Sequence, residues 1–481
     1  MRWHHDRWSS ILEGVTRRAL TALAASIATT SIFACEGLIG ADFSRTLRSD
    51  SEEAGNDTDG AIEGDASLGA DGARRTDGAA RDARASDAKL DALTSPPKQC
   101  GDVGGLDPTA PWPMTGFCPS RPNRSPAPSL ASPQVRRRFA LPPGSAGATM
   151  TSFGSGVSLD ANGVAYALVT ELVNSVYVYS VAAIGKSAEL WRTPVPSPMP
   201  GVVGEASTPV LAANGAVYCA SGSTLFALTR AGAISWSRSL SVPIAGPPLV
   251  LGDGTVVVVS GPAVRAFTPA GADAWTFAND AGSYFVGSVT ATPAGALLVV
   301  RAPSLGLVDA LLDSFNPNGT LNWTRSLSFV PSSVPLVDDQ GRIVVRSNGG
   351  ISVFSTSGTP ILTKSTLGGG DQENVFPAAI SSGVWFGDGK DLLFLDGVSG
   401  GTSVPSGPAG RRGPVIATAS DDVLFVIKNG TAANVVSLAP DGSERWSVPV
   451  DGTNADLRSA ALSASGEVFA PVGPTLFVLG P

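Results

Sequence analysis

Residues 228–236 read Leu-Thr-Arg-Ala-Gly-Ala-Ile-Ser-Trp, with Gly232 four positions after the leucine and Trp236 four positions after the glycine. The same spacing returns without gaps at residues 267–275, 315–323 and 438–446. These copies carry Gly271 and Trp275, Gly319 and Trp323, and Gly442 and Trp446. Glycine permits the positive φ of a tight hairpin, and a tryptophan in the strand that follows can pack between neighbouring sheets.

Looser copies of this stretch place further glycines at positions 185, 358 and 400, so the repeated glycines are 39 to 48 residues apart. A period of this length is typical of blade repeats. Each unit holds four short strand-like runs separated by turn residues, for example near residues 207–211, 216–220, 224–229 and 234–240. Such a unit buries its faces only against copies of itself, so the residues predict an all-β propeller of four-stranded blades.

The number of blades follows from the two ends of the repeat. The last unit, residues 458–481, has three strand-like runs and then the chain stops. Residues 136–141, ahead of the first full unit, supply the missing outer strand, which gives eight blades closed by pairing the chain ends. Closure of this kind removes exposed sheet edges. Seven blades is the alternative, because the unit at residues 378–408 is the least regular.

The first 34 residues predict an export signal. A charged segment is followed by about fifteen mostly apolar residues, too few to span a bilayer as a helix. The run ends in Ile-Phe-Ala-Cys at residues 32–35, which resembles the lipobox of bacterial lipoproteins and would make Cys35 the lipidated residue. An ordinary secretory leader is the alternative. We expect a protein of the cell envelope, held by its lipid on the periplasmic or surface side of the outer membrane.

Residues 35–99 predict a disordered tether. No aromatic residue occurs between positions 44 and 111, and the stretch from Glu36 to Gln99 carries 14 acidic and 8 basic residues. A segment this poor in apolar side chains cannot bury enough surface to offset the entropy of ordering. We expect it to hold the folded part of the chain away from the membrane.

Cysteine usage agrees with export. Cys100 and Cys118 bracket a stretch rich in glycine and proline within a lead-in at residues 100–134, and an oxidising envelope favours their pairing. Cys219 lies in a strand-like run with no cationic neighbour, and we expect it to be a buried apolar residue. The propeller itself is expected at residues 135–481.

Composition excludes several function classes. The chain has only two histidines, His4 and His5, and both precede the expected cleavage site. The mature protein therefore lacks Ser-His-Asp or Cys-His catalysis and histidine-ligated zinc or haem. A net charge of −8 argues against nucleic acid as a partner. We assign no catalytic residue and no metal ligand.

The glycine and tryptophan repeat resembles the pyrroloquinoline-quinone-like (PQQ-like) propeller family. That family includes quinoprotein dehydrogenases and the propeller lipoprotein of the outer-membrane barrel-assembly machinery. Residues 111–114 and 125–127 also resemble the lead-in found before such propellers. The dehydrogenases use adjacent cysteines and a Glu, Asn and Asp set that binds calcium, and this chain has no adjacent cysteines. We therefore expect no cofactor and favour a non-catalytic scaffold or binding platform. A PQQ- and calcium-dependent dehydrogenase with a divergent site is the alternative.

The alternation of strand direction limits where a partner can bind. Connections between units share one face with the loops joining second and third strands, opposite the glycine turns. On that face, Asp371, Glu373, Asn374 and Tyr284 lie in long or polar loops, and we predict that they contribute to a partner site. We expect that partner to be an envelope protein or a surface ligand. A sugar- or peptide-binding role is a further alternative.

Overall fold

The computed structural model describes residues 100–481 except 197–207, 280–282, 304–309, 329–333, 348–349, 366–376, 388–391, 404–410 and 452–456. The expected signal peptide, the lipidation site Cys35 and the tether therefore lie outside the described residues, as do Asp371, Glu373 and Asn374. Within the described part of the chain, every named element is a β-strand, as the sequence predicts.

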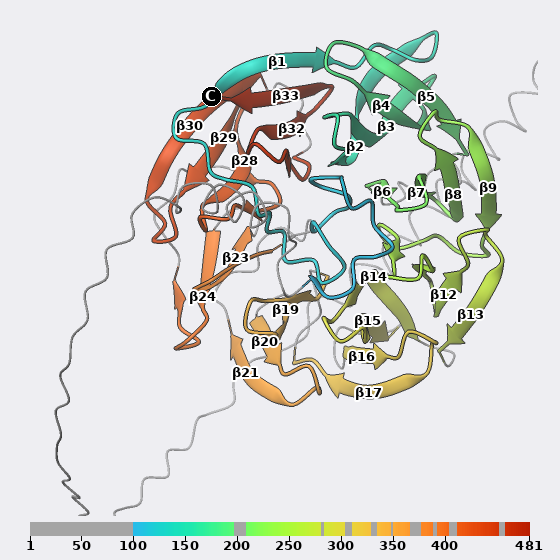
Figure 1. Ribbon diagram of the computed structural model, residues 1–481, viewed down its shortest axis with the longest axis vertical. Coiled ribbons are helices and arrows are strands. Elements are labelled where there is room, and N and C mark those ends of the chain that lie inside the picture. The colour runs from blue at the N-terminus through green and yellow to red at the C-terminus, as the bar shows by residue number, and fades with distance from the viewer. Residues whose placement is uncertain are drawn as a thin grey trace, which may run out of the picture. The chain divides into compact units, whose positions relative to one another are not determined.

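The strands form eight antiparallel sheets that surround a central axis as blades (Figure 1). In most blades the strands follow one another in chain order from the axis outward. Blade 1 contains β2 (Ala148–Leu159), β3 (Ala165–Val173), β4 (Val176–Ile184) and β5 (Glu189–Val195); blade 2 contains β6 (Val210–Leu211), β7 (Ala216–Ser221), β8 (Thr224–Thr229) and β9 (Ile234–Ser239). Blade 3 contains β10 (Leu249–Val250), β11 (Val256–Ser260), β12 (Ala263–Phe267) and β13 (Asp273–Ala278); blade 4 contains β14 (Ser283–Ala291), β15 (Leu297–Pro303), β16 (Leu311–Phe315) and β17 (Leu321–Ser326).

The second half of the ring repeats this arrangement with three changes. Blade 5 contains β18 (Leu336–Val337), β19 (Ile343–Ser347), β20 (Gly350–Phe354) and β21 (Pro360–Ser365); blade 6 contains β22 (Ala378–Ile380), β23 (Gly383–Gly387), β24 (Leu392–Asp396) and β25 (Thr402–Ser403). Blade 7 contains β26 (Arg411–Arg412), β27 (Ile416–Ala417), β28 (Val423–Asn429), β29 (Ala432–Leu438) and β30 (Glu444–Asp451); blade 8 contains β31 (Ala461–Leu462), β32 (Val468–Val472), β33 (Thr475–Gly480) and β1 (Gln134–Ala140). The outer strand of blade 6 has two residues, the inner strand of blade 7 is split between β26 and β27, and blade 8 takes its outer strand from the start of the propeller.

This last exchange closes the ring. Strand β1 pairs antiparallel with β33, with Gln134 opposite Gly480 and Ala140 opposite Thr475. The prediction of eight blades closed by an N-terminal outer strand is confirmed, and the seven-bladed alternative is wrong. The strand begins two residues earlier than the sequence pattern indicates, at the point where Val135 and Arg137 flank an irregularity in the pairing.

A contact between glycine and tryptophan joins consecutive blades. Gly271, in the hairpin between β12 and β13, has a φ of +82°, and a Cβ added there would lie 2.6 Å from Trp236 Cδ2 of the preceding blade. Trp236 Nε1 donates to the Pro269 carbonyl at 3.0 Å, and Arg238 Nε donates to the Gly271 carbonyl at 2.5 Å. The same ring-on-glycine contact joins Trp191 to Gly232, Trp275 to Gly319, and Trp323 to Gly358. In these four seams, from blade 1 to blade 5, the tryptophan of one unit therefore packs on the glycine of the next unit.

The two middle strands of each blade supply most of the core. In β11 all five residues are buried, and β7, β19 and β32 show nearly the same pattern. The outer strand β9 is largely exposed apart from Trp236. The core therefore lies between blades, where the faces of neighbouring sheets meet, as a stack of half-buried sheets requires.

Candidate functional site

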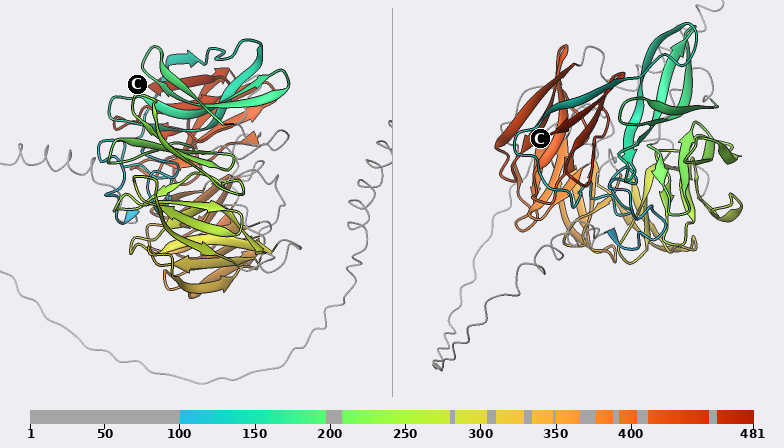
Figure 2. Two further views of the ribbon diagram at one scale, coloured as in Figure 1. Left: turned by 90° about the vertical axis from the view of Figure 1, so that its right-hand side faces the viewer. Right: turned by 45° about the horizontal axis from the view of Figure 1, so that its top comes forward.

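The lead-in closes one mouth of the ring. We call residues 100–131 the plug, and the mouth it occupies is on the turn face, which carries the hairpins between first and second strands of each blade. The plug runs through the centre of the ring in Figure 1 and lies to one side of it in Figure 2. Its backbone approaches the β10–β11 hairpin so closely that a Cβ on Gly105 would collide with the Leu251 carbonyl.

The plug forms backbone hydrogen bonds with six of the eight innermost strands. The amides that donate are those of Leu159, Leu211, Ala291, Val337, Ala379 and Ala417; the carbonyls that accept them belong to Trp112, Pro113, Pro119, Ser120, Pro122 and Asn123, at 2.7 to 3.0 Å. Innermost strands have an open edge toward the axis, and unpaired buried amides are costly. Three of the accepting residues are prolines, which offer a carbonyl and leave no N–H of their own to satisfy.

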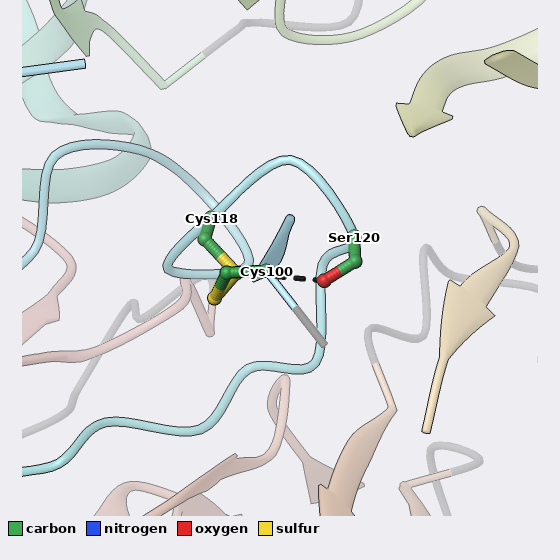
Figure 3. The surroundings of a disulfide bond; sticks show 3 residues. All are labelled: Cys100, Cys118 and Ser120. Carbon is green, nitrogen blue, oxygen red and sulfur yellow. Dashed lines mark hydrogen bonds between the residues drawn. A yellow bond between two sulfur atoms is a disulfide. The ribbon is translucent and has the colours of Figure 1, made fainter. Parts of the chain in front are cut away.

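The plug has two limbs, which cover different blades. Limb one, residues 100–115, lies over blades 1 to 3, and limb two, residues 119–131, contacts blades 4 to 8 in chain order. The disulfide between Cys100 and Cys118 joins the start of limb one to the residue directly before limb two (Figure 3). Gly101, next to this disulfide, lies against Pro293 of blade 4. The predicted pairing of these cysteines is confirmed, and both are buried.

Arg121 fixes limb two against blade 4. Its side chain is 2% exposed. Nε donates to the Val289 carbonyl at 2.9 Å, Nη2 to the Ser288 hydroxyl at 2.6 Å, and Nη1 to the Thr115 carbonyl at 3.1 Å. Burial lowers the pKa of the guanidinium to about 9, because desolvation disfavours the charged form. Carbonyl and hydroxyl dipoles of the plug and of blade 4 thus surround this cation.

Two ion-pair groups hold the plug to the hairpins of the turn face. Arg124 of limb two lies between Asp339 of blade 5 and Asp421 of blade 7, with Nη2 at 2.6 Å from Asp421 Oδ1. Burial raises the pKa of Asp339 above its ordinary value, although Arg124 opposes the shift. In limb one, Asp107 accepts from Arg230 of blade 2 at 2.7 Å.

The opposite face carries the connections between blades and has exposed apolar side chains. The β3–β4 hairpin of blade 1 is built from longer strands than its counterparts, and Val176 and Tyr177 at its tip are 49% and 38% exposed. Met150 of β2 is 40% exposed and lies opposite Leu172, which in turn lies opposite Tyr177. These three side chains therefore form one row across the sheet.

The structure describes one of the four residues predicted for partner binding. Tyr284 is the second residue of β14, on the opposite face, and is 45% exposed. The apolar row of blade 1 was not predicted from the sequence. A signal was present in the chain: strand-like residues continue from Ala165 to Val173 and again from Val176 to Ile184, well beyond the five or six residues of most blades.

Cys219 is buried in β7, where the sequence places an apolar residue. Among the described residues, no group of three or more His, Cys, Asp or Glu side chains is arranged to hold a metal ion. A search of the same residues finds no helix long and apolar enough to cross a membrane.

The repeated blades, the closing strand and the glycine–tryptophan seams define a β-propeller. Residues 177–366 match the family model described as outer membrane protein assembly factor BamB, and the propeller is accordingly of the PQQ-like repeat class. No curated protein sequence matches the chain.

Solved structures similar to the chain include two remote ones. A protein of unknown function from Bacteroides caccae is 12% identical, with 48% of this chain and 92% of that chain covered and a TM-score of 0.34. The dihydro-heme d1 dehydrogenase NirN, solved in complex with DHE, is 14% identical, with 67% and 78% covered and a TM-score of 0.46.

Proposed function

We propose that the chain is an exported envelope protein, lipidated at Cys35, whose propeller is a non-catalytic scaffold that binds another envelope protein through the face opposite the plug. The observation that carries this proposal is the position of the plug on the turn face. Cys100, where the described chain begins, lies within the plug, so the chain from the proposed anchor reaches the ring on the turn face. The opposite face is then the face that carries no attachment to the tether, which leaves it open to a partner.

The side chains of the opposite face support the same proposal. Met150, Val176, Tyr177 and Tyr284 are large apolar or aromatic residues with 38% to 49% of their surface exposed. Tyrosine and methionine are enriched in protein interfaces, and tyrosine is frequent among the residues that dominate binding energy. The function proposed here involves no bound quinone or calcium.

Site-specific crosslinking in intact cells tests the proposed face. A photoreactive amino acid replaces Tyr177 or Tyr284 in the full chain, and Val398 provides the matched control. Val398 is 91% exposed in the β24–β25 hairpin of the turn face. We expect crosslinks to one envelope protein from both tyrosine positions and none from Val398. Crosslinks from Val398 alone, or equally from all three positions, would refute the assignment of the binding face.

A further inference from the structure

The two limbs of the plug are held in different ways. Limb two leads directly into β1, which is paired along its length with β33. It is also held by the buried side chain of Arg121, by the ion pairs of Arg124, and by Trp446 Nε1, which donates to the Leu130 carbonyl at 2.8 Å. Limb two is therefore continuous with the strand that closes the ring.

Limb one makes fewer polar contacts with the blades, although its Leu106, Trp112 and Met114 side chains are buried. Four backbone hydrogen bonds hold it to the blades. The amides of Leu159, Leu211 and Ala213 donate to the carbonyls of Trp112, Pro113 and Gly105, respectively, and the Asp107 amide donates to the Leu211 carbonyl. One ion pair, between Asp107 and Arg230, supports these bonds. The disulfide ties the beginning of limb one to Cys118, so both ends of the limb are fixed at blade 4.

We infer that the Cys100–Cys118 disulfide is a redox latch for limb one alone, which it holds against blades 1 to 3 on the turn face. Reduction by a dithiol transfers two electrons and two protons, leaving two thiols on the plug and a disulfide on the reductant. Cys100 is then no longer joined to Cys118, so limb one can separate from blades 1 to 3, while limb two and the ring stay in place. This role of the disulfide does not depend on the proposed export, which determines only the compartment in which the disulfide forms.

Opening limb one changes the surface of the turn face. Leu106, Trp112 and Met114 of limb one are at most 3% exposed when the limb lies against the blades. These side chains become exposed when the limb separates from the blades. The oxidised protein therefore keeps these apolar side chains buried, and the reduced protein exposes them on the turn face. For a closed loop of 18 residues, the chain-entropy model gives an effect of about 100-fold on the opening equilibrium.

Hydrogen exchange of the full chain tests this inference, because the two limbs protect different amides. The limb-one reporters are Leu159, Leu211 and Ala213, and the limb-two reporters are Val337, Ala379 and Ala417. The oxidised protein is compared with the Cys100→Ser/Cys118→Ser variant and with native protein reduced by dithiothreitol. Cys219→Ala is the control for removal of a buried thiol outside the disulfide.

We expect protection at the limb-one reporters to fall about 100-fold in the variant and in the reduced protein, with the limb-two reporters unchanged. The Cys219→Ala control should retain protection at both sets. Equal loss at both sets would show that the disulfide supports the whole plug or the whole ring. Unchanged protection at both sets would show that the disulfide latches nothing. Either result overturns the inference.

Discussion

The contact between Gly271 and Trp236 predicts the effect of adding a single methyl group at a seam. Gly271→Ala places a Cβ 2.6 Å from the indole ring, in a residue whose φ is +82°. A non-glycine residue in the left-handed region costs about 1 kcal/mol. Overpacking a filled contact adds about 2 kcal/mol. We expect the variant to lose about 3 kcal/mol of unfolding free energy in total.

A second glycine separates these two contributions. Gly215 in the β6–β7 hairpin has a φ of +81°, and a Cβ added there meets nothing within 4 Å. Gly215→Ala should therefore lose only the backbone cost of about 1 kcal/mol. Urea denaturation of the full chain, followed by tryptophan fluorescence, gives the unfolding midpoint of each variant. Equal destabilisation by the two variants would refute the steric reasoning about the seam.

A double variant checks that the excess cost arises at the indole ring. In the seam between blades 5 and 6, Leu362 takes the place of the tryptophan against Gly400. We therefore expect Trp236→Leu to relieve part of the collision. The double variant Gly271→Ala/Trp236→Leu should be less destabilised than the sum of the single variants by about 1 kcal/mol. Additive effects would show that the alanine collides with something else.

Three further predictions concern the lipid anchor, Glu171 of blade 1 and the plug. Cys35→Ser should release the full chain from the membrane fraction, as measured by fractionation and by incorporation of a labelled fatty acid; retention of both signals would exclude lipidation at this residue. Burial raises the pKa of Glu171, but the Gly144 amide, a serine hydroxyl and an arginine outweigh it, so the pKa lies below its usual 4.5. A carboxyl group whose pKa is lowered in the folded state stabilises the fold at pH values above its unfolded-state pKa, and this stabilisation is lost as the pH falls through the folded-state pKa. Glu171→Gln should therefore be less stable than the native protein at pH 7, and the difference in unfolding free energy should narrow below about pH 4.5. A difference that stays constant with pH in urea melts would contradict this. Arg124→Gln removes charged contacts to Asp339 and Asp421 and should lower the unfolding free energy by about 2 kcal/mol, measured by the same urea melts. An unchanged unfolding free energy would contradict the assignment of these ion pairs.

The ring was predictable from the sequence because its signals are local and repeated. The spacing from Gly232 to Trp236 recurs at regular intervals, and the last unit lacks one strand that residues 136–141 resemble. Turn chemistry and strand length then leave little freedom in the architecture. The pattern did not reveal that Trp191, Trp236, Trp275 and Trp323 pack on the glycine of the following unit. The spacing would be the same if each tryptophan packed on the glycine of its own unit.

The plug could not be predicted because it has no period. Its fold depends on hydrogen bonds between residues more than 100 positions apart, such as that from Ala291 to Pro119. The alternation of prolines with polar residues around Pro119 and Pro122 hints at a segment that accepts hydrogen bonds. Nothing in that stretch indicates which amides donate them. The apolar row of blade 1 was missed for a different reason, because Tyr177 resembles an ordinary core residue until its hairpin is seen to project.

The position of the plug also decides how the protein would respond to mechanical load. A pull on the chain upstream of Cys100 passes through the disulfide to Cys118 and bypasses the intervening residues of limb one. From there the tension is shared by limb two, whose hydrogen bonds reach blades 4 to 7, before it arrives at β1. The strand that closes the ring is thus shielded from the end at which the protein is pulled, and the propeller can be tethered by its N-terminus without being unzipped from it.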